Sequence, residues 1–195
     1  MERVITPFLK NRVFISVVCS LLLAVSLFTV CAENAFATSK NLSITRQTQE
    51  KNNWCWAASA SMVGRLISSS GPSQSTICNW VKGGIVDAKA SNSEMVTALA
   101  LATNKSSNFS SVYSYASIIA TITNNRALVA KIEWTNGSGY HYVVFSGYND
   151  SGSYVRITDP WYNCGNVSYA YSNLITGTAI QSGTGKYVLT FYHSA

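Results

Sequence analysis

The sequence predicts an α+β fold, with helices in the first half of the folded region and an antiparallel sheet in the second. Apolar residues recur at spacings near three and four as far as residue 122, which is the pattern of amphipathic helices. From residue 127 onward, short runs rich in β-branched and aromatic residues alternate with Gly, Asn, Asp and Ser clusters, which indicates strands joined by tight turns. Helices and strands in separate blocks favour α+β over an alternating α/β arrangement.

The first residues predict a secretory signal peptide over residues 1–37. Three basic residues precede an apolar run over residues 13–30, and an Ala-x-Ala site ends at Ala37. A basic start, an apolar middle and a small-residue end are typical of a cleaved signal. The alternative is a membrane anchor, because the apolar run could just span a bilayer. We expect cleavage after Ala37, export of the protein, and no stable membrane insertion afterwards.

Residues 38–195 are then expected to form a single domain, long enough to bury a substantial core. The whole chain of 195 residues has a formal net charge of +6, and 11% of its residues are charged. The basic residues are scattered along the sequence, so we expect no nucleic-acid partner. The Cys and His residues lack the close spacing of a zinc site, and no metal or cofactor is expected. We expect a monomer.

The helical half is predicted to contain four helices. The first begins beside Trp54 and stops before Gly71-Pro72, because Gly and Pro end helices. Ser91 and Glu94 have the spacing of a capping box, which marks the start of a helix. The predicted helices cover residues 54–67, 75–82, 91–102 and 115–122.

The second half is predicted to contain five strands, separated by Asn-Gly and Gly/Ser/Asp-rich turns. The turn over residues 149–152 would join two of them as a hairpin. The predicted strands cover residues 127–134, 140–148, 154–158, 167–171 and 186–192.

Three cysteines remain after signal cleavage, namely Cys55, Cys78 and Cys164. An odd number in an exported protein suggests one disulfide and one free thiol. Each of the three can be the free one, and the count alone does not choose among them.

Cys55 stands between two tryptophans at the start of the first predicted helix. A buried cysteine can simply act as a small hydrophobic residue. A free thiol is mostly protonated at neutral pH, and the positive end of a helix dipole and a neighbouring imidazolium both favour the reactive thiolate. His141, inside an apolar strand, is the candidate imidazole. Asp159, at the end of the next strand, is the candidate carboxylate that orients it.

An acyl-transfer site also needs donors for the oxyanion. The backbone N–H of Cys55 can be one donor, and the side-chain amide of Gln49, shortly upstream, can be another. Gln47 lies in the same stretch and is the alternative donor if the loop is offset.

Three segments resemble the papain-like cysteine peptidases, and in particular the bacterial branch that contains the AvrRpt2-type (C70) and C39-like peptidases. They are residues 49–59 with the core Trp-Cys-Trp-Ala-Ala-Ser, residues 141–148 and residues 157–160. The resemblance implies a two-lobed papain-like fold, with a helical lobe and a sheet lobe facing a cleft. It implies that Gln49 is the oxyanion residue, Cys55 the nucleophile, His141 the base and acid, and Asp159 the orienting carboxylate.

The sequence therefore predicts a secreted bacterial cysteine endopeptidase that hydrolyses proteins or peptides through an acyl-enzyme. A thiol amidase or acyltransferase acting on cell-wall peptides is one alternative, because the same triad serves these reactions. A non-catalytic secreted binding module is another. If Cys55 is the nucleophile, the remaining cysteines, Cys78 and Cys164, are expected to form a disulfide, the alternative being two free thiols.

Overall fold

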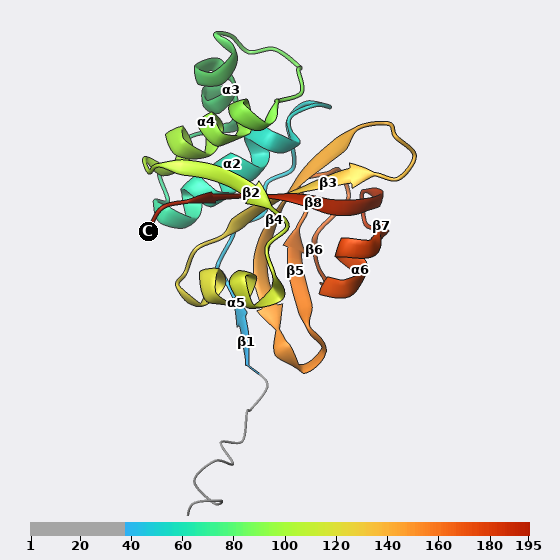
Figure 1. The fold of residues 1–195 in the computed structure, drawn as a ribbon. Helices are drawn as coiled ribbons and strands as arrows, with labels where there is room; N and C mark the ends of the chain where they lie inside the picture. Colours follow the sequence, from blue (N-terminus) through green and yellow to red (C-terminus); the bar gives the residue numbers. More distant parts are fainter. Residues whose placement is uncertain (1–37) are drawn as a thin grey trace, which may run out of the picture. The chain divides into compact units, whose positions relative to one another are not determined.

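The computed structural model describes residues 38–195, and the predicted signal peptide with its cleavage site after Ala37 lies outside them. The first lobe of the described region consists of three helices, α2 (Cys55–Ile67), α3 (Gln74–Lys82) and α4 (Asn92–Thr103), which gather at one side of the sheet in Figure 1. No helix within residues 38–195 combines the length and apolar character that a membrane span requires.

Helix α2 is the buried centre of this lobe. Every residue from Cys55 to Gly64 is buried, which its run of Ala, Ser and Gly makes possible, because small side chains let neighbouring elements approach closely. A Cβ added at Gly64 would lie 2.5 Å from the carbonyl oxygen of Ala102 in α4. A side chain at that position would therefore push the two helices apart.

The starts of α3 and α4 are set by serine caps. Ser73 accepts a hydrogen bond from the backbone N–H of Thr76, and the predicted capping box between Ser91 and Glu94 is present at the start of α4. Helix α3 ends at Lys82 and is capped by Gly83, whose φ of 71° lies in the left-handed region that glycine adopts without strain. These caps fix both ends of the loop that connects α3 to α4.

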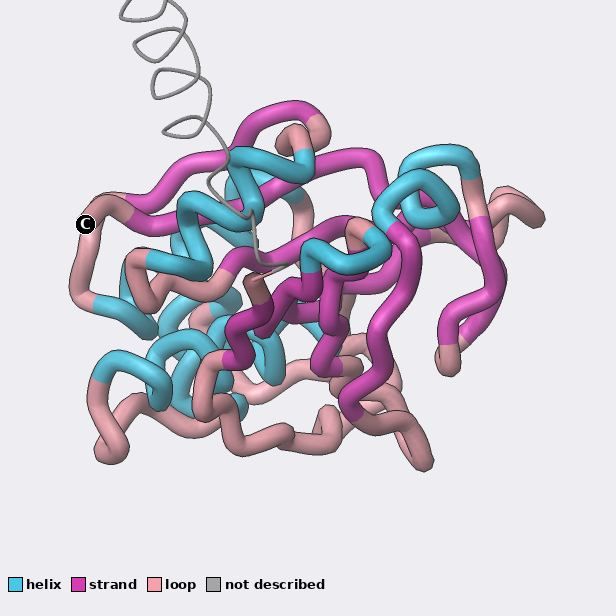
Figure 2. The backbone as a smooth tube through the Cα atoms, turned by 90° about the horizontal axis from the view of Figure 1, so that it is seen from below, coloured by secondary structure: helices cyan, strands magenta, loops and turns pink. Residues whose placement is uncertain are grey.

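The second lobe is built on an antiparallel sheet with the strand order β2-β8-β3-β4-β5-β6, with β1 pairing with β4 and β7 with β8. Figure 2 shows the backbone from below, with the strands in magenta and the helices in cyan. Two further helices, α5 and α6, lie in this half of the chain. The bounds are β1 (Ser39–Asn41), β2 (Ser107–Ser111), α5 (Tyr115–Thr123), β3 (Leu128–Trp134), β4 (Tyr140–Asn149), β5 (Tyr154–Thr158), β6 (Asn166–Ala170), α6 (Tyr171–Thr176), β7 (Thr178–Ile180) and β8 (Gly183–His193).

The α+β class with an antiparallel sheet is confirmed, and the helices and strands predicted from the sequence are all present. Three short strands, β1, β2 and β7, and the short helix α6 were not predicted. Strand β2 has the polar sequence Ser-Asn-Phe-Ser-Ser, which carries no apolar alternation, and it forms only by pairing with β8.

The two lobes meet along β4, the most buried strand. All of its residues except the first and the last are buried, and the strand contacts both α2 and α5. The hydroxyl of Ser59 in α2 donates a hydrogen bond to the carbonyl oxygen of Tyr142 in β4, at 3.2 Å. This contact fixes α2 against the strand that carries His141.

The expected disulfide between Cys78 and Cys164 is not formed, because the cysteines within residues 38–195 are all free. Cys78 is fully buried in the helical lobe, where its Sγ lies 3.4 Å from the carbonyl oxygens of both Gly84 and Val86. Cys164 lies in the loop after β5, on the sheet lobe. The Cys78 side chain is thus directed into the core of its own lobe, and a bridge would require that lobe to be repacked.

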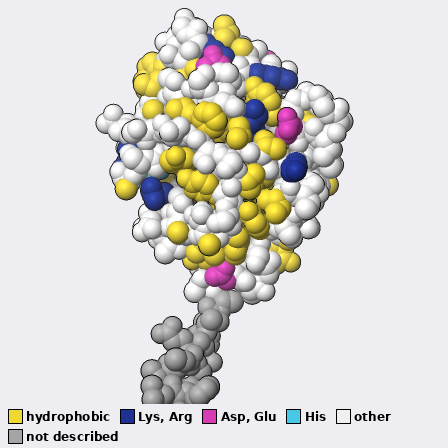
Figure 3. Space-filling view, viewed as in Figure 1, with side chains coloured by type: hydrophobic (Ala, Val, Ile, Leu, Met, Phe, Trp, Pro, Cys, Tyr) yellow, Lys and Arg dark blue, Asp and Glu magenta, His cyan; other side chains and the backbone are white. Residues whose placement is uncertain are grey.

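Charged side chains are sparse on the surface. On the face shown in Figure 3, Lys and Arg side chains lie apart from one another among apolar and neutral polar groups. This face carries no continuous basic patch of the kind that binds a phosphate backbone.

Candidate active site

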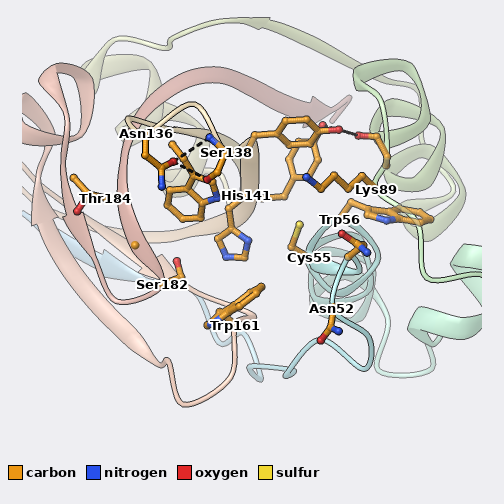
Figure 4. A pocket seen from close by; sticks show the side chains of 16 residues that line it. Asn52, Cys55, Trp56, Lys89, Asn136, Ser138, His141, Trp161, Ser182 and Thr184 are labelled. Carbon is orange, nitrogen blue, oxygen red and sulfur yellow. Dashed lines mark hydrogen bonds between the residues drawn. The ribbon is translucent and has the colours of Figure 1, made fainter.

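Cys55 is the first residue of α2 and lines a cavity of about 410 Å³ to which both lobes contribute. Its exposed fraction is 9%, so the thiol is shielded but faces the cavity. Figure 4 shows the Cys55 side chain and the His141 ring entering this cavity from α2 and from β4. The first turn of α2 contains no acidic residue, so the positive end of the helix dipole is left uncompensated beside the sulfur.

His141 is held in one orientation by contacts on three sides. Its Nε2 lies 2.8 Å from Oδ1 of Asp159. The Trp134 ring stacks on the imidazole with centroids 5.6 Å apart, and the Trp161 ring meets it edge-on at 5.8 Å. Because Nε2 is bound to the carboxylate, Nδ1 is the ring nitrogen left for Cys55.

The surroundings of His141 favour the imidazolium. Burial lowers the pKa of His141, but the hydrogen bond to Asp159, the neighbouring Cys55 and the negative charge of Asp159 outweigh burial and raise the pKa to about 9. At neutral pH the ring is therefore protonated. A protonated imidazole next to a sulfur is one of the features that activate cysteine nucleophiles in general.

Asp159 is 2% exposed and receives three hydrogen bonds. Oδ1 accepts from His141 and from the backbone N–H of Trp161 at 2.9 Å, and Oδ2 accepts from the hydroxyl of Ser182 at 2.7 Å. Burial raises the pKa of Asp159, but these bonds and the His141 charge lower it below its usual range. Arg46 also donates to the Asp159 backbone oxygen at 2.7 Å, which secures the end of β5.

The β4–β5 hairpin brings the histidine and the aspartate together, as predicted. Val144 pairs with Thr158 in the ladder, so Asp159 comes one step further, near the level of Val143. His141 lies on the same side of β4 as Val143, because side chains two residues apart in a strand share a face. Residues that are distant in the sequence therefore become neighbours through strand register alone.

The amide of Gln49 lies in the turn that leads into α2. The side chain is 1% exposed, and its Nε2 donates to the carbonyl oxygens of Lys51 and Asn52 at 2.9 and 2.8 Å. Its Oε1 has no hydrogen-bond partner within residues 38–195. Gln49 thus supports the turn before Cys55 without lining the cavity.

Gln47, the alternative oxyanion donor, lies further from the thiol along α2. Its amide exchanges hydrogen bonds with the hydroxyl of Ser61, at 3.1 and 3.2 Å. Ser61 stands in the second turn of the helix, well beyond the first turn that carries Cys55. Like Gln49, Gln47 is not among the residues that line the cavity.

The site includes three side chains that the sequence did not assign to it. Trp134 and Trp161 enclose the imidazole, and Ser182 binds the carboxylate. Trp161 had a sequence signal, because it follows Asp159-Pro160 directly. Trp134 and Ser182 had none, since their positions depend on how β3 and the β7–β8 turn fold against β4 and β5. Within the described region, no group of three or more His, Cys, Asp or Glu is placed to hold a metal.

Comparisons with known proteins assign the chain to a family. A model of the Peptidase_C39 like family matches residues 41–181. A search of curated protein sequences finds no match. The AvrRpt2-type branch of the sequence-based expectation is not confirmed.

Two solved structures share the fold. A Bacillus anthracis protein described as a C39-like peptidase has a TM-score of 0.57 and 12% identity, covering 81% of this chain and 99% of that one. The peptidase domain of Streptococcus ComA, a bifunctional ABC transporter of a quorum-sensing pathway, has a TM-score of 0.51 and 14% identity, covering 76% and 97%. The family match spans most of the chain, and these two neighbours share its fold. The chain belongs to the Peptidase_C39 like family of cysteine peptidases.

Proposed function

We propose that this protein is a secreted cysteine endopeptidase that cleaves peptide bonds through an acyl-enzyme on Cys55. One observation carries the proposal. His141, with its Nε2 2.8 Å from Asp159 and a pKa of about 9, faces Cys55 across a cavity shared by the two lobes. A buried carboxylate, an oriented imidazolium and a thiol in this order form the arrangement that activates a cysteine nucleophile.

The proposed reaction proceeds in two halves. The Cys55 thiolate attacks the carbonyl carbon of the scissile bond, and His141 gives its Nδ1 proton to the leaving amine as the C–N bond breaks. This leaves a thioester and a neutral imidazole. The imidazole then takes a proton from water, and the resulting hydroxide attacks the thioester carbon. When the C–S bond breaks, the acid product leaves and the thiolate–imidazolium pair is restored.

The oxyanion in both halves needs hydrogen-bond donors. The first N–H bonded within α2 is that of Ala58, which donates to the Trp54 carbonyl at 2.9 Å, so the N–H of Cys55 is available. We assign the second donor to Gln49, whose Nε2 hydrogens point at two carbonyl oxygens just before Cys55. Both hydrogens are bound to carbonyl oxygens, and the side chain does not line the cavity in the absence of substrate. The proposed role therefore requires the Gln49 amide to turn toward Cys55 when substrate binds.

A Gln49→Ala variant is expected to lower kcat about 10²- to 10³-fold, the cost of losing one oxyanion donor. The matched control is Gln47→Ala, because Gln47 is a second glutamine of the same segment bound to Ser61. We expect the control to keep its kcat. Steady-state kinetics on a cleaved peptide, with thermal unfolding of both variants, measure the two effects separately. Equal kcat values for Gln49→Ala and wild type would remove Gln49 from the oxyanion hole.

Substrate class is tested by offering the wild-type protein and a Cys55→Ala variant two materials, an unfolded protein and purified cell-wall peptides with an amine acceptor. The proposal expects peptide-bond cleavage of the unfolded protein by wild type alone. Cys55-dependent turnover of the cell-wall peptides alone would favour the amidase or acyltransferase.

The proposed signal peptide makes a separate prediction. If residues 1–37 are cleaved on export, N-terminal sequencing of wild-type protein purified from culture medium should show a chain that begins immediately after Ala37.

A further inference from the structure

Lys89 places a positive charge in the cavity beside Cys55. It belongs to the loop between α3 and α4, and its exposed side chain lines the cavity (Figure 4). A Cβ built on Gly139, the residue before β4, would lie 3.0 Å from the Lys89 Nζ. The ammonium group therefore reaches from the helical lobe to the start of the strand that carries His141.

The backbone beneath Lys89 is fixed on both sides. The Trp56 indole donates to the Ala88 carbonyl at 3.0 Å, and the Tyr140 hydroxyl donates to the Ala90 carbonyl at 2.7 Å. Lys82 donates to the carbonyl of Lys89 itself at 2.8 Å. Because the loop is fixed at three successive carbonyls, the backbone that carries the Lys89 side chain is held in place. The ammonium group of Lys89 remains free to bind a ligand.

No acidic side chain neutralises this ammonium within residues 38–195. Lys89 takes part in none of the ion pairs or side-chain hydrogen bonds there, and the described cavity lining includes no Asp or Glu. The carboxylates closest in the sequence have other partners, since Glu94 binds Lys82 at 2.7 Å and Asp87 accepts from the Asn53 N–H at 2.8 Å. An uncompensated charge in a concave site attracts a ligand of the opposite sign.

We propose that Lys89 is a specificity residue that binds a carboxylate of the peptide substrate near the scissile bond. The inference rests on the proposed peptidase function and names the chemistry that this cleft selects. Apart from Cys55 and His141, whose opposite charges offset each other in the proposed thiolate–imidazolium pair, the rest of the lining is neutral, with groups such as Asn52, Asn136, Ser138 and Thr184. An Asp or Glu side chain and a C-terminal carboxylate share this chemistry, and the test distinguishes them.

The effect is expected to be modest and sensitive to salt. Because the Lys89 side chain is exposed, its pairing with a carboxylate should raise kcat/KM only about fivefold over the matching amide. The preference should shrink as ionic strength rises, since salt screens exposed charges. A role of Lys89 in folding alone would show neither the selectivity nor its dependence on salt.

The test uses a peptide that the wild-type protein cleaves, identified by mass spectrometry of a digested unfolded protein. Glu, Gln or Lys is placed in turn at each of the positions flanking the cleaved bond, and the parent peptide is also made with a free or an amidated C-terminus. The kcat/KM values are compared for wild type, Lys89→Gln and Lys89→Glu. Lys105→Glu is the control, because it makes the same charge change in a different cavity.

Wild type should prefer Glu over Gln at one position, Lys89→Gln should lose this preference, and Lys89→Glu should prefer Lys. A preference confined to the free C-terminus, lost in Lys89→Gln, would identify the terminal carboxylate as the ligand. Equal kcat/KM for Glu and Gln and for both C-termini in wild type, or a preference unchanged in Lys89→Gln, would overturn the inference. If wild type cleaves no peptide at all, the proposed function fails as well, and this outcome differs from cleavage without selectivity.

Discussion

A Cys55→Ala variant is expected to lower kcat for peptide-bond hydrolysis about a million-fold, the loss that follows removal of a catalytic nucleophile. No other thiol can replace it. Cys78 is buried in the helical lobe with its sulfur against two backbone carbonyls, and Cys164 lies in the loop after β5 and is not among the residues that line the cavity. Burial and the Asp159 charge also raise the pKa of Cys164, which keeps that thiol protonated.

The substitution should leave the fold intact. It removes one sulfur atom that borders the cavity, so we expect the free energy of unfolding to change by about 1 kcal/mol. Cys164→Ala is the matched control and should keep full activity. Activity of both variants on an unfolded protein, with thermal unfolding to check the fold, measures the effect. Hydrolysis that survives in Cys55→Ala would show that the nucleophile lies elsewhere.

An Asp159→Asn variant should lower kcat about 10²- to 10⁴-fold. The amide oxygen can still accept hydrogen bonds from His141 and the Trp161 N–H, and the amide nitrogen can donate to Ser182, so the geometry is retained. What is lost is the negative charge and the strong hydrogen bond that hold the pKa of His141 at about 9. Burial then dominates, and the pKa of His141 falls.

The pH profile separates this effect from simple misfolding. In wild type, the imidazolium is present below about pH 9 and is lost as the pH rises through that value, so kcat/KM should decline there. In Asp159→Asn the decline should move to lower pH. Asp150→Asn, which changes an exposed carboxylate in the β4–β5 turn, is the control and should keep the wild-type profile. If kcat/KM of Asp159→Asn declines at the same alkaline pH as that of wild type, the role assigned to the carboxylate is contradicted.

Local signals predicted most of the fold because they arise within a single element. The capping box at Ser91 and the apolar run of β4 have the same meaning in any tertiary context. Strand β2 was missed because its polar residues are ordered by the edge of β8. Helix α6 was missed because the expected strand over residues 167–171 ends at Ala170, and the chain turns into a helix at Tyr171.

The candidate site was predictable where chemistry and order along the chain sufficed. Cys55, His141 and Asp159 could be named from their types and positions, and the hairpin between β4 and β5 explains how two of them meet. The stacking of Trp134 on His141 could not be foreseen, because it depends on the register of β3 against β4. The disulfide expected between Cys78 and Cys164 is absent for a related reason. The number of cysteines in a sequence gives no distance between them.

The thiolate–imidazolium pair can be detected without any substrate by following alkylation of the cysteines with iodoacetamide at pH 6. Peptide mapping by mass spectrometry then gives the rate at each site. We expect rapid modification of Cys55, little of Cys78 or Cys164, and loss of the Cys55 rate in His141→Ala, because an ordinary thiol is almost fully protonated at this pH. If Cys55 in the folded wild-type protein reacts no faster than in the unfolded chain, the thiol is not activated and this account of the site is wrong.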